Sequence, residues 1–233
     1  HIPNRLQYLA DITKSAVYKS MNSIIDYILD RIPHILTNTQ VINEVTSFYE
    51  ANPSYTTDTH IQIFIKITIL ILKNEQLRSS GNTYAKIIQI LKLFKYPSLL
   101  GLLIQQIEDI NVLICRNVNN GKFKETIPFY FTVLYILINY SNKSEMNIIV
   151  KLLVKKGMNT DIYQTVEHGD KVYMFPYLCG NYANQYKLNK QRDINFHNLI
   201  SALTSSICTF TTQPDNSTCR KIVITALQNV CIP

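Results

Sequence analysis

The stretch that decides the fold is Glu125–Ile162, which reads ETIPFYFTVLYILINYSNKSEMNIIVKLLVKKGMNTDI. Its first half, Pro128–Tyr140, is almost entirely apolar and predicts a buried helix with proline in the first turn. Its second half, Glu145–Lys156, has apolar residues at helical spacing and ends in two lysines followed by Gly157. Lysines in the last turn and a glycine just beyond it are typical of a helix C-terminus. The stretch therefore predicts two consecutive helices.

The segments on either side repeat this organisation. Gly81, Gly121 and Gly169 lie in polar stretches, 40 residues apart (81 to 121) and 48 residues apart (121 to 169). Pairs of apolar helices are expected between them. One such pair cannot bury its apolar face alone, so a recurring pair with a glycine-bearing turn predicts units that stack side by side.

A family resemblance follows from these residues. Ile148–Gly157 resembles the second helix of an ankyrin repeat and its terminating glycine. Asp109–Asn111 and Asn119–Gly121 resemble the outgoing finger and the turn into the next unit. The insertion Tyr140–Ser144 is similar to those of divergent viral ankyrin-repeat proteins of the poxvirus type. The resemblance covers about Gly81–Pro176.

The chain also departs from this family. No unit carries the Thr-Pro-Leu-His motif intact, and Thr126–Phe129 is the nearest segment, so the turn geometry is open. We expect an all-α fold of stacked helix pairs, a divergent ankyrin-like solenoid. An irregular globular α-helical domain is the alternative. We expect a single domain over residues 1–233, with N-terminal helices in 1–59, ankyrin-like helix pairs in 60–176 and a C-terminal helical cap in 177–233.

Apolar spacing predicts further helices over Asn4–Ser20, Asn22–Leu36, Gln40–Glu50, Asn82–Phe94, Ser98–Asp109, Asn195–Cys208 and Thr218–Cys231. The segment His60–Lys73 is ambiguous, because isoleucines at every second position favour a strand. Its polar residues nevertheless gather in a narrow stripe when the segment is drawn as a helix. Since about 14 residues is long for a strand, we expect a helix.

Composition limits the class of protein. The 233 residues include 17% charged residues, which argues against wholesale disorder, and only 6 Gly and 8 Pro, too few for the many turns of a sheet sandwich. The formal net charge of +7 permits acidic partners or nucleic acid. The longest apolar runs, Ile67–Leu72 and Ile127–Ile138, are too short for a membrane span. Cys208 and Cys219 bracket a polar loop, and whether they pair is open.

The sequence contains no recognisable motif for a metal site, a catalytic nucleophile or a phosphate-binding loop. His168, Cys179, His197 and Cys208 have spacings that match no familiar metal site. There is no GxSxG nucleophile motif, and Ser79–Lys86 lacks the glycines and the ending of a phosphate-binding loop. We therefore expect a protein that is not an enzyme and that binds no cofactor or metal.

The predicted function is a protein-interaction scaffold, a viral factor that binds a host or viral protein through its ankyrin-like surface. We expect it in the host cytoplasm, with the nucleus or the virion as alternatives. The residues expected to contact the partner, at turn tips, are Arg116, Asn119, Lys122, Tyr163, Glu167 and His168. The alternative is a basic viral nucleic-acid-binding or nucleocapsid-associated protein. Its rings and cations would be Tyr182, Tyr186, Lys187, Lys190 and Arg192.

Overall fold

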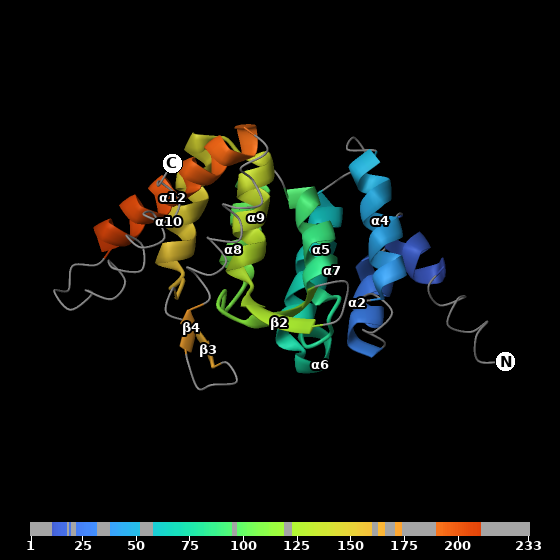
Figure 1. Ribbon diagram of the computed structural model, residues 1–233. Helices are drawn as coiled ribbons and strands as arrows, with labels where there is room; N and C mark the ends of the chain where they lie inside the picture. The colour runs from blue at the N-terminus through green and yellow to red at the C-terminus, as the bar shows by residue number, and fades with distance from the viewer. Residues whose placement is uncertain are drawn as a thin grey trace. The chain divides into compact units, whose positions relative to one another are not determined.

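The computed structural model is mostly helical (Figure 1). It describes residues 11–17, 19, 22–31, 38–51, 58–94, 97–118, 123–159, 163–165, 171–173 and 190–210. The chain forms two compact units. Unit 1 comprises residues 1–94 and 112–127, and unit 2 comprises residues 95–111 and 128–233. The predicted single domain stays a prediction.

Unit 1 is a group of helices with one β-hairpin. Its helices after residues 11–17 are α2 (Asn22–Arg31), α4 (Thr39–Ala51), α5 (Asp58–Lys73), α6 (Glu75–Arg78), α7 (Thr83–Leu91) and the 3-10 turn η2 (Lys92–Phe94). The hairpin strands are β1 (Leu113–Val118) and β2 (Phe123–Pro128). Helix α5 packs against α2, α6 and α7, and β1 packs against α6 and α7. The hairpin is thus attached to the helices of its own unit.

The ambiguous segment is a helix, as predicted. In α5, the alternating isoleucines are buried at positions 61, 63, 65, 67 and 71, and Ile69 is half-buried. The exposed residues Asp58, Gln62 and Lys66 follow the narrow polar stripe of the helical interpretation. Alternation did not produce a strand because neighbouring helices cover almost every side of α5. Propensity yields to burial in such a case.

An aromatic cluster joins three helical segments of unit 1. The buried ring of Tyr49 on α4 lies 4.6 Å from the ring of His60 and 5.9 Å from the ring of Phe64, both on α5. The Tyr49 hydroxyl donates a hydrogen bond to the Val17 carbonyl, 3.4 Å away. The cluster buries large apolar surface and satisfies its phenol at the same time.

Unit 2 consists of four described helices and a β-hairpin, and three of the helices, α8, α10 and α12, form a row. Its elements are α8 (Pro97–Gln106), α9 (Tyr130–Tyr140), α10 (Lys143–Lys155), β3 (Tyr163–Thr165), β4 (Lys171–Tyr173) and α12 (Lys190–Phe210). Helix α10 packs against both α8 and α12, and α12 also packs against α9 (Figure 1). Strands β3 and β4 are antiparallel, with Tyr163 opposite Tyr173. Helix α9 is buried along most of its length, as its apolar sequence predicts.

Several expectations need correction. The fold is mostly helical rather than all-α, because two β-hairpins interrupt the helices. Helix α9 begins at Tyr130, since Pro128 still belongs to β2. Helix α10 begins two residues earlier than predicted, because Asn142 and Glu145 form a capping box that closes its N-terminus. It ends at Lys155, one residue before the predicted Lys156, and the expected terminating residue Gly157 lies in the left-handed region at φ 81°.

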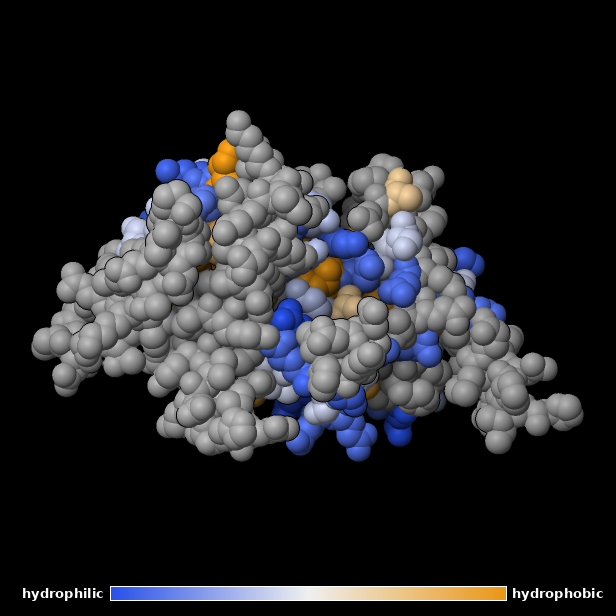
Figure 2. Space-filling model, in the orientation of Figure 1, coloured by the Kyte–Doolittle hydropathy of each residue, from blue (hydrophilic) through white to orange (hydrophobic). Residues whose placement is uncertain are grey.

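The C-terminal helices and the absence of a membrane span were also predicted. Helix α12 starts five residues before the predicted Asn195, and the predicted helix Thr218–Cys231 lies outside the described residues. Within the described part of the chain, no helix has the length and apolar character needed to cross a membrane. The described residues in view in Figure 2 are mostly hydrophilic, with a few apolar spots, which fits the burial of the aliphatic side chains.

Candidate functional site

The predicted partner-binding residues belong to the two hairpins. Arg116 lies in β1, and Tyr163 lies in β3 opposite Tyr173. The connections 119–122 and 166–170 contain the other four, Asn119, Lys122, Glu167 and His168, and lie outside the described residues. The structure therefore places Arg116 and Tyr163 in strands that lead toward the two hairpin tips. Whether any of the six contacts a partner stays a prediction.

Arg116 is not at a tip but inside the β1–β2 hairpin. Its Nε donates to Glu125 Oε2 on β2 at 2.6 Å, and the two side chains are only 17% and 10% exposed. The guanidinium carbon also lies 5.8 Å from the centre of the Tyr84 ring on α7. A charge-assisted hydrogen bond and a cation–π contact thus hold this side chain from two directions.

The strand β1 is also bonded to the turn before α7. The Asn117 backbone N–H donates to the Gly81 carbonyl at 3.0 Å, and the Asn117 side-chain amide donates to Asn82 Oδ1 at 3.2 Å. A Cβ on residue 81 would lie 2.0 Å from Asn117 Oδ1, closer than atoms can approach. An alanine at position 81 would therefore displace the exposed Asn117 side chain from its hydrogen bond with Asn82. We call the contacts of Arg116, Glu125, Tyr84, Asn117 and Gly81 the hairpin clamp.

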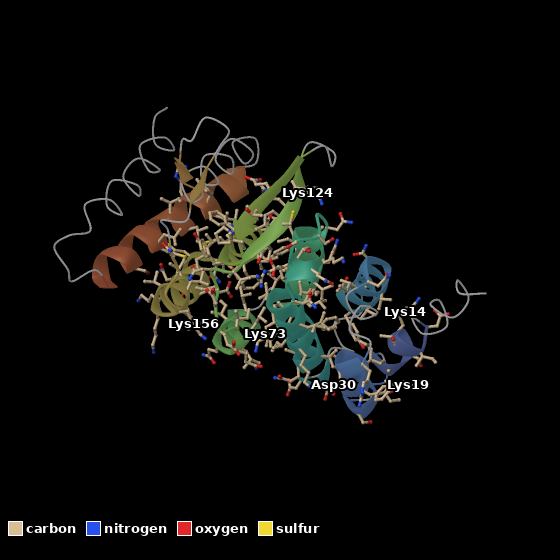
Figure 3. The ribbon with its side chains drawn as sticks, turned by 90° about the horizontal axis from the view of Figure 1, so that it is seen from below. Lys14, Lys19, Asp30, Lys73, Lys124 and Lys156 are labelled. Carbon is tan, nitrogen blue, oxygen red and sulfur yellow. The ribbon has the colours of Figure 1, made fainter. Side chains whose placement is uncertain are left out.

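The charge of this hairpin is mostly positive. Glu125 is the only acidic residue between Leu113 and Pro128, and Arg116 is bonded to it. Lys124 on β2 is exposed (Figure 3). On α7, burial lowers the pKa of the Lys86 ammonium below its usual value. A negatively charged or polar partner group would find suitable electrostatics here.

Unit 2 holds a second notable arrangement, between the turns that follow α8 and α10. The Asn159 N–H donates to Asn111 Oδ1 at 2.7 Å, and Asn111 Nδ2 donates to the Gly157 carbonyl at 2.9 Å. Asp109 Oδ1 accepts the Asn111 N–H at 2.8 Å, which orients this asparagine. We call the paired segments Ile107–Asn111 and Lys156–Asn159 the turn joint.

Two further side chains close the turn joint. Lys156 Nζ donates to the carbonyls of Gln105 and Ile107, at 2.9 and 2.8 Å, at the C-terminal end of α8. The Tyr130 hydroxyl donates to the Asn159 carbonyl at 2.9 Å. Helix α8 has no basic residue in its own last turn, so Lys156 supplies the cation that a helix C-terminus favours. The turn joint thus holds the turn after α8 beside the turn after α10.

The residues of the nucleic-acid alternative are only partly described. Lys190 and Arg192 lie in the first turn of α12. Tyr182, Tyr186 and Lys187 lie outside the described residues, as do His168, Cys179 and Cys219. Whether the predicted rings and cations come together lies beyond the described residues, and this alternative stays a prediction.

Neither a metal centre among the described residues nor a similar protein points to a function. Among the residues that the structure describes, no group of three or more His, Cys, Asp or Glu could hold a metal ion. The chain matches no protein-family model, no curated protein and no solved structure.

Sequence reasoning missed the clamp partners of Arg116. Glu125 and Tyr84 were not singled out, and Asn117 was overlooked. One signal was present, because Arg116 and Glu125 each lie three residues from the connection 119–122. Residues at equal distances from a hairpin connection can face one another across two strands. The contacts with Tyr84 and Gly81 join residues far apart in the sequence, and nothing in the local pattern indicates them.

Proposed function

We propose that this chain is a non-enzymatic protein-interaction scaffold, a divergent ankyrin-like array of helix pairs whose hairpin tips contact a partner protein. The observation that carries the proposal is the turn joint. Asn111 and Lys156 link the turn after α8 to the turn after α10. A stack of repeats requires equivalent turns to lie side by side, because each repeat covers the apolar face of the next.

Helix packing in unit 2 supports the same interpretation. Helix α10 packs against two neighbouring helices, α8 and α12. At Gly101 on α8, an added Cβ would lie 3.7 Å from Ile149 Cδ1 and 3.8 Å from Leu152 Cδ2, so the backbone of α8 comes near α10. Alternate helices of the chain thus form a row, as second helices do in a solenoid.

The order of elements along the chain adds a further argument. The hairpin β1–β2 precedes α9 and α10, and the hairpin β3–β4 follows them. A helix pair bounded by two hairpins fits the ankyrin resemblance, in which a finger separates successive pairs. We extend the proposal to a viral origin and a host partner, which only that resemblance implies.

Photo-cross-linking tests the proposal. A photoreactive amino acid replaces Lys122 in the full chain, and the same group at Lys143, exposed at the start of α10, is the matched control. The host-cell lysate should yield a cross-linked protein from position 122 that is absent from position 143. Failure to recover any protein specific to position 122 would contradict the proposal.

A charge-balanced variant sharpens this test. Lys122→Glu combined with Glu167→Lys changes both hairpin connections without changing net charge. For this comparison the photoreactive group is placed at position 119. We expect the swapped variant to capture roughly tenfold less of the partner protein than the unswapped chain does, as for a removed interface contact. The control is Lys19→Glu with Asp30→Lys, two exposed residues of unit 1 (Figure 3). Equal capture by the two swapped variants would sink the tip assignment.

The nucleic-acid alternative has its own test. Binding of a fluorescent single-stranded oligonucleotide by the full chain is measured between about 50 and 200 mM salt, over which phosphate contacts weaken steeply. The scaffold proposal predicts no binding that competes with the cross-linked protein. Tight binding that falls steeply with salt and displaces that protein would favour the alternative.

A further inference from the structure

We infer that one exposed stripe of α10 is a docking surface for an acidic amphipathic helix of a partner protein. The stripe, which we call the α10 stripe, consists of the exposed residues Ser144, Ile148, Lys151 and Lys155. At 3.6 residues per turn these positions lie within about 60° of one another, so they form a line along about three turns of the helix. The inference goes beyond the proposed function, because the α10 stripe shares no residue with the proposed hairpin tips.

The α10 stripe has an apolar centre. Ile148 is 61% exposed, the largest exposed fraction of any leucine, isoleucine or valine that the structure describes. Leu152 follows it by four residues, so the two side chains are neighbours on the helix surface, and Leu152 is half-buried. The inner side of Leu152 faces α8, since its Cδ2 would lie 3.8 Å from a Cβ added at Gly101. Packing within unit 2 thus leaves an isoleucine–leucine pair partly in water, and a partner that covers this pair removes apolar surface from water.

The charge beside this apolar pair is positive. Lys151 and Lys155 are both exposed, and in the described part of the chain neither forms an ion pair. Glu145 is the only acidic residue of α10, and its carboxylate accepts the Asn142 N–H at 2.9 Å in the capping box. The α10 stripe therefore has no anion of its own. A complementary partner supplies carboxylates next to its apolar side chains.

Spacing and charge together determine the occupant. The stripe residues recur at i, i+4, i+7 and i+11, the spacing at which one helix contacts another lying along it. A second copy of this chain fits poorly, because a symmetric contact between two α10 stripes would place lysines opposite lysines. An acidic helix has the opposite charge. We therefore assign the α10 stripe to a helix with leucines on one face and glutamates beside them.

Fluorescence anisotropy with designed peptides tests the inference on the full chain. The probes are fluorescein-labelled helical peptides with leucines at i, i+3, i+4 and i+7 and glutamates beside them, in a panel that varies the leucine spacing. At least one should bind the wild type, and its counterpart with lysine in place of every glutamate should not. Ile148→Gln, and Lys151→Glu combined with Lys155→Glu, should each weaken binding by roughly tenfold or more, as at an interface hot spot. Failure of every acidic peptide to bind the wild type overturns the inference.

Matched controls come from unit 1. Tyr27→Gln removes an aromatic side chain that is 63% exposed on α2, and Lys19→Glu with Lys124→Glu makes the same charge change at two other exposed lysines. Both should bind the acidic peptide with wild-type affinity. Equal weakening by the two double charge variants would show attraction to net charge alone and would overturn the assignment to the α10 stripe. If Ile148→Gln lowers the urea midpoint, Ile148→Ala, which favours the helix, takes its place in the titration.

Two further measurements separate the acidic helix from other occupants. Sedimentation velocity should give the same oligomeric state for the wild type and Ile148→Gln, and a dimer lost in the variant would assign the α10 stripe to a second copy. Flotation with vesicles of phosphatidylcholine and phosphatidylserine should likewise not depend on Ile148. Vesicle binding that Ile148→Gln abolishes would assign the stripe to an anionic membrane, and either result overturns the inference. Cross-linking from position 122 reports only on the hairpin tips, so the proposed function can fail while this titration succeeds.

Discussion

Asn111 and Asn159 link the turn after α8 to the turn after α10, because the Asn159 N–H donates to the Asn111 side-chain oxygen at 2.7 Å. The same Asn111 donates its amide to the Gly157 carbonyl at 2.9 Å. One side chain thus satisfies a donor and an acceptor of the neighbouring turn. We expect Asn111→Ala to lower the free energy of unfolding by about 1–2 kcal/mol, the value of two net hydrogen bonds.

Urea denaturation followed by circular dichroism measures this effect. Asn111→Asp keeps the acceptor and loses the donor, so its midpoint should lie between those of the wild type and Asn111→Ala. The control is Asn43→Ala, an exposed asparagine of α4, which should change stability by less than about 0.5 kcal/mol. If Asn111→Ala unfolds at the wild-type urea concentration, the turn joint contributes no stability.

Lys156 should contribute through the end of α8. Lys156→Met removes two hydrogen bonds to the Gln105 and Ile107 carbonyls and the cation near that helix terminus. We expect a loss of about 1 kcal/mol at low salt, smaller in high salt because the charge is screened. The control is Lys151→Met, an exposed lysine of α10 before its last turn. Equal midpoints for the two variants at low salt would contradict this role.

Two glycines should respond in opposite ways to alanine. Gly81→Ala would push the exposed Asn117 side chain aside and break its hydrogen bond to Asn82, which should cost about 0.5–1.5 kcal/mol. Gly101→Ala places its methyl group at ordinary contact distances inside α8, so stability should stay equal or rise by up to about 1 kcal/mol. Thermal unfolding of both variants checks the order. A Gly81→Ala variant as stable as the wild type would mean that the Asn117 side chain contributes nothing to this contact.

Lys86 should make stability depend on pH. Burial lowers its pKa in the folded state below the ordinary 10.5. Below that lowered pKa the folded protein bears the full cost of burying the charge. As the pH rises from there toward 10.5, the unfolded chain holds more protons and this cost disappears. Lys86→Met should therefore be more stable than the wild type at neutral pH, and the difference should shrink as the pH rises.

Urea midpoints measured from pH 7 to about pH 11, past the ordinary lysine pKa, test this dependence. Lys124→Met controls for the loss of one lysine charge, because its side chain is exposed. A constant difference between Lys86→Met and the wild type over this range would show that burial of the ammonium has no part in it.

Most helices could be predicted from the sequence because local patterns carry their signals. Apolar spacing located α4, α7 and α10, and Gly157 marked the end of α10. The capping box of Asn142 and Glu145 was also readable in the sequence, yet the predicted helix began at Glu145. Ends of helices depend on such single side chains, so they are harder to place than the helices themselves.

The hairpins and the clamp were harder to predict for a physical reason. The segment around Asn119–Gly121 was interpreted as a turn between helices, although six-residue strands flank it on both sides. Those strands are held by contacts that local sequence does not contain, from Asn117 to Gly81 and from Arg116 to Tyr84. Strand formation depends on such distant neighbours more strongly than helix formation does.

The central claim is that the turns after α8 and α10 lie side by side within unit 2, as the proposed stack of helix pairs requires. Nuclear Overhauser effects in the deuterated, amide-protonated full chain test it most directly. We predict cross-peaks between the Asn111 side-chain amide protons and the backbone amide protons near Gly157 and Asn159. Fully assigned signals from these residues without any such cross-peak would contradict the claim.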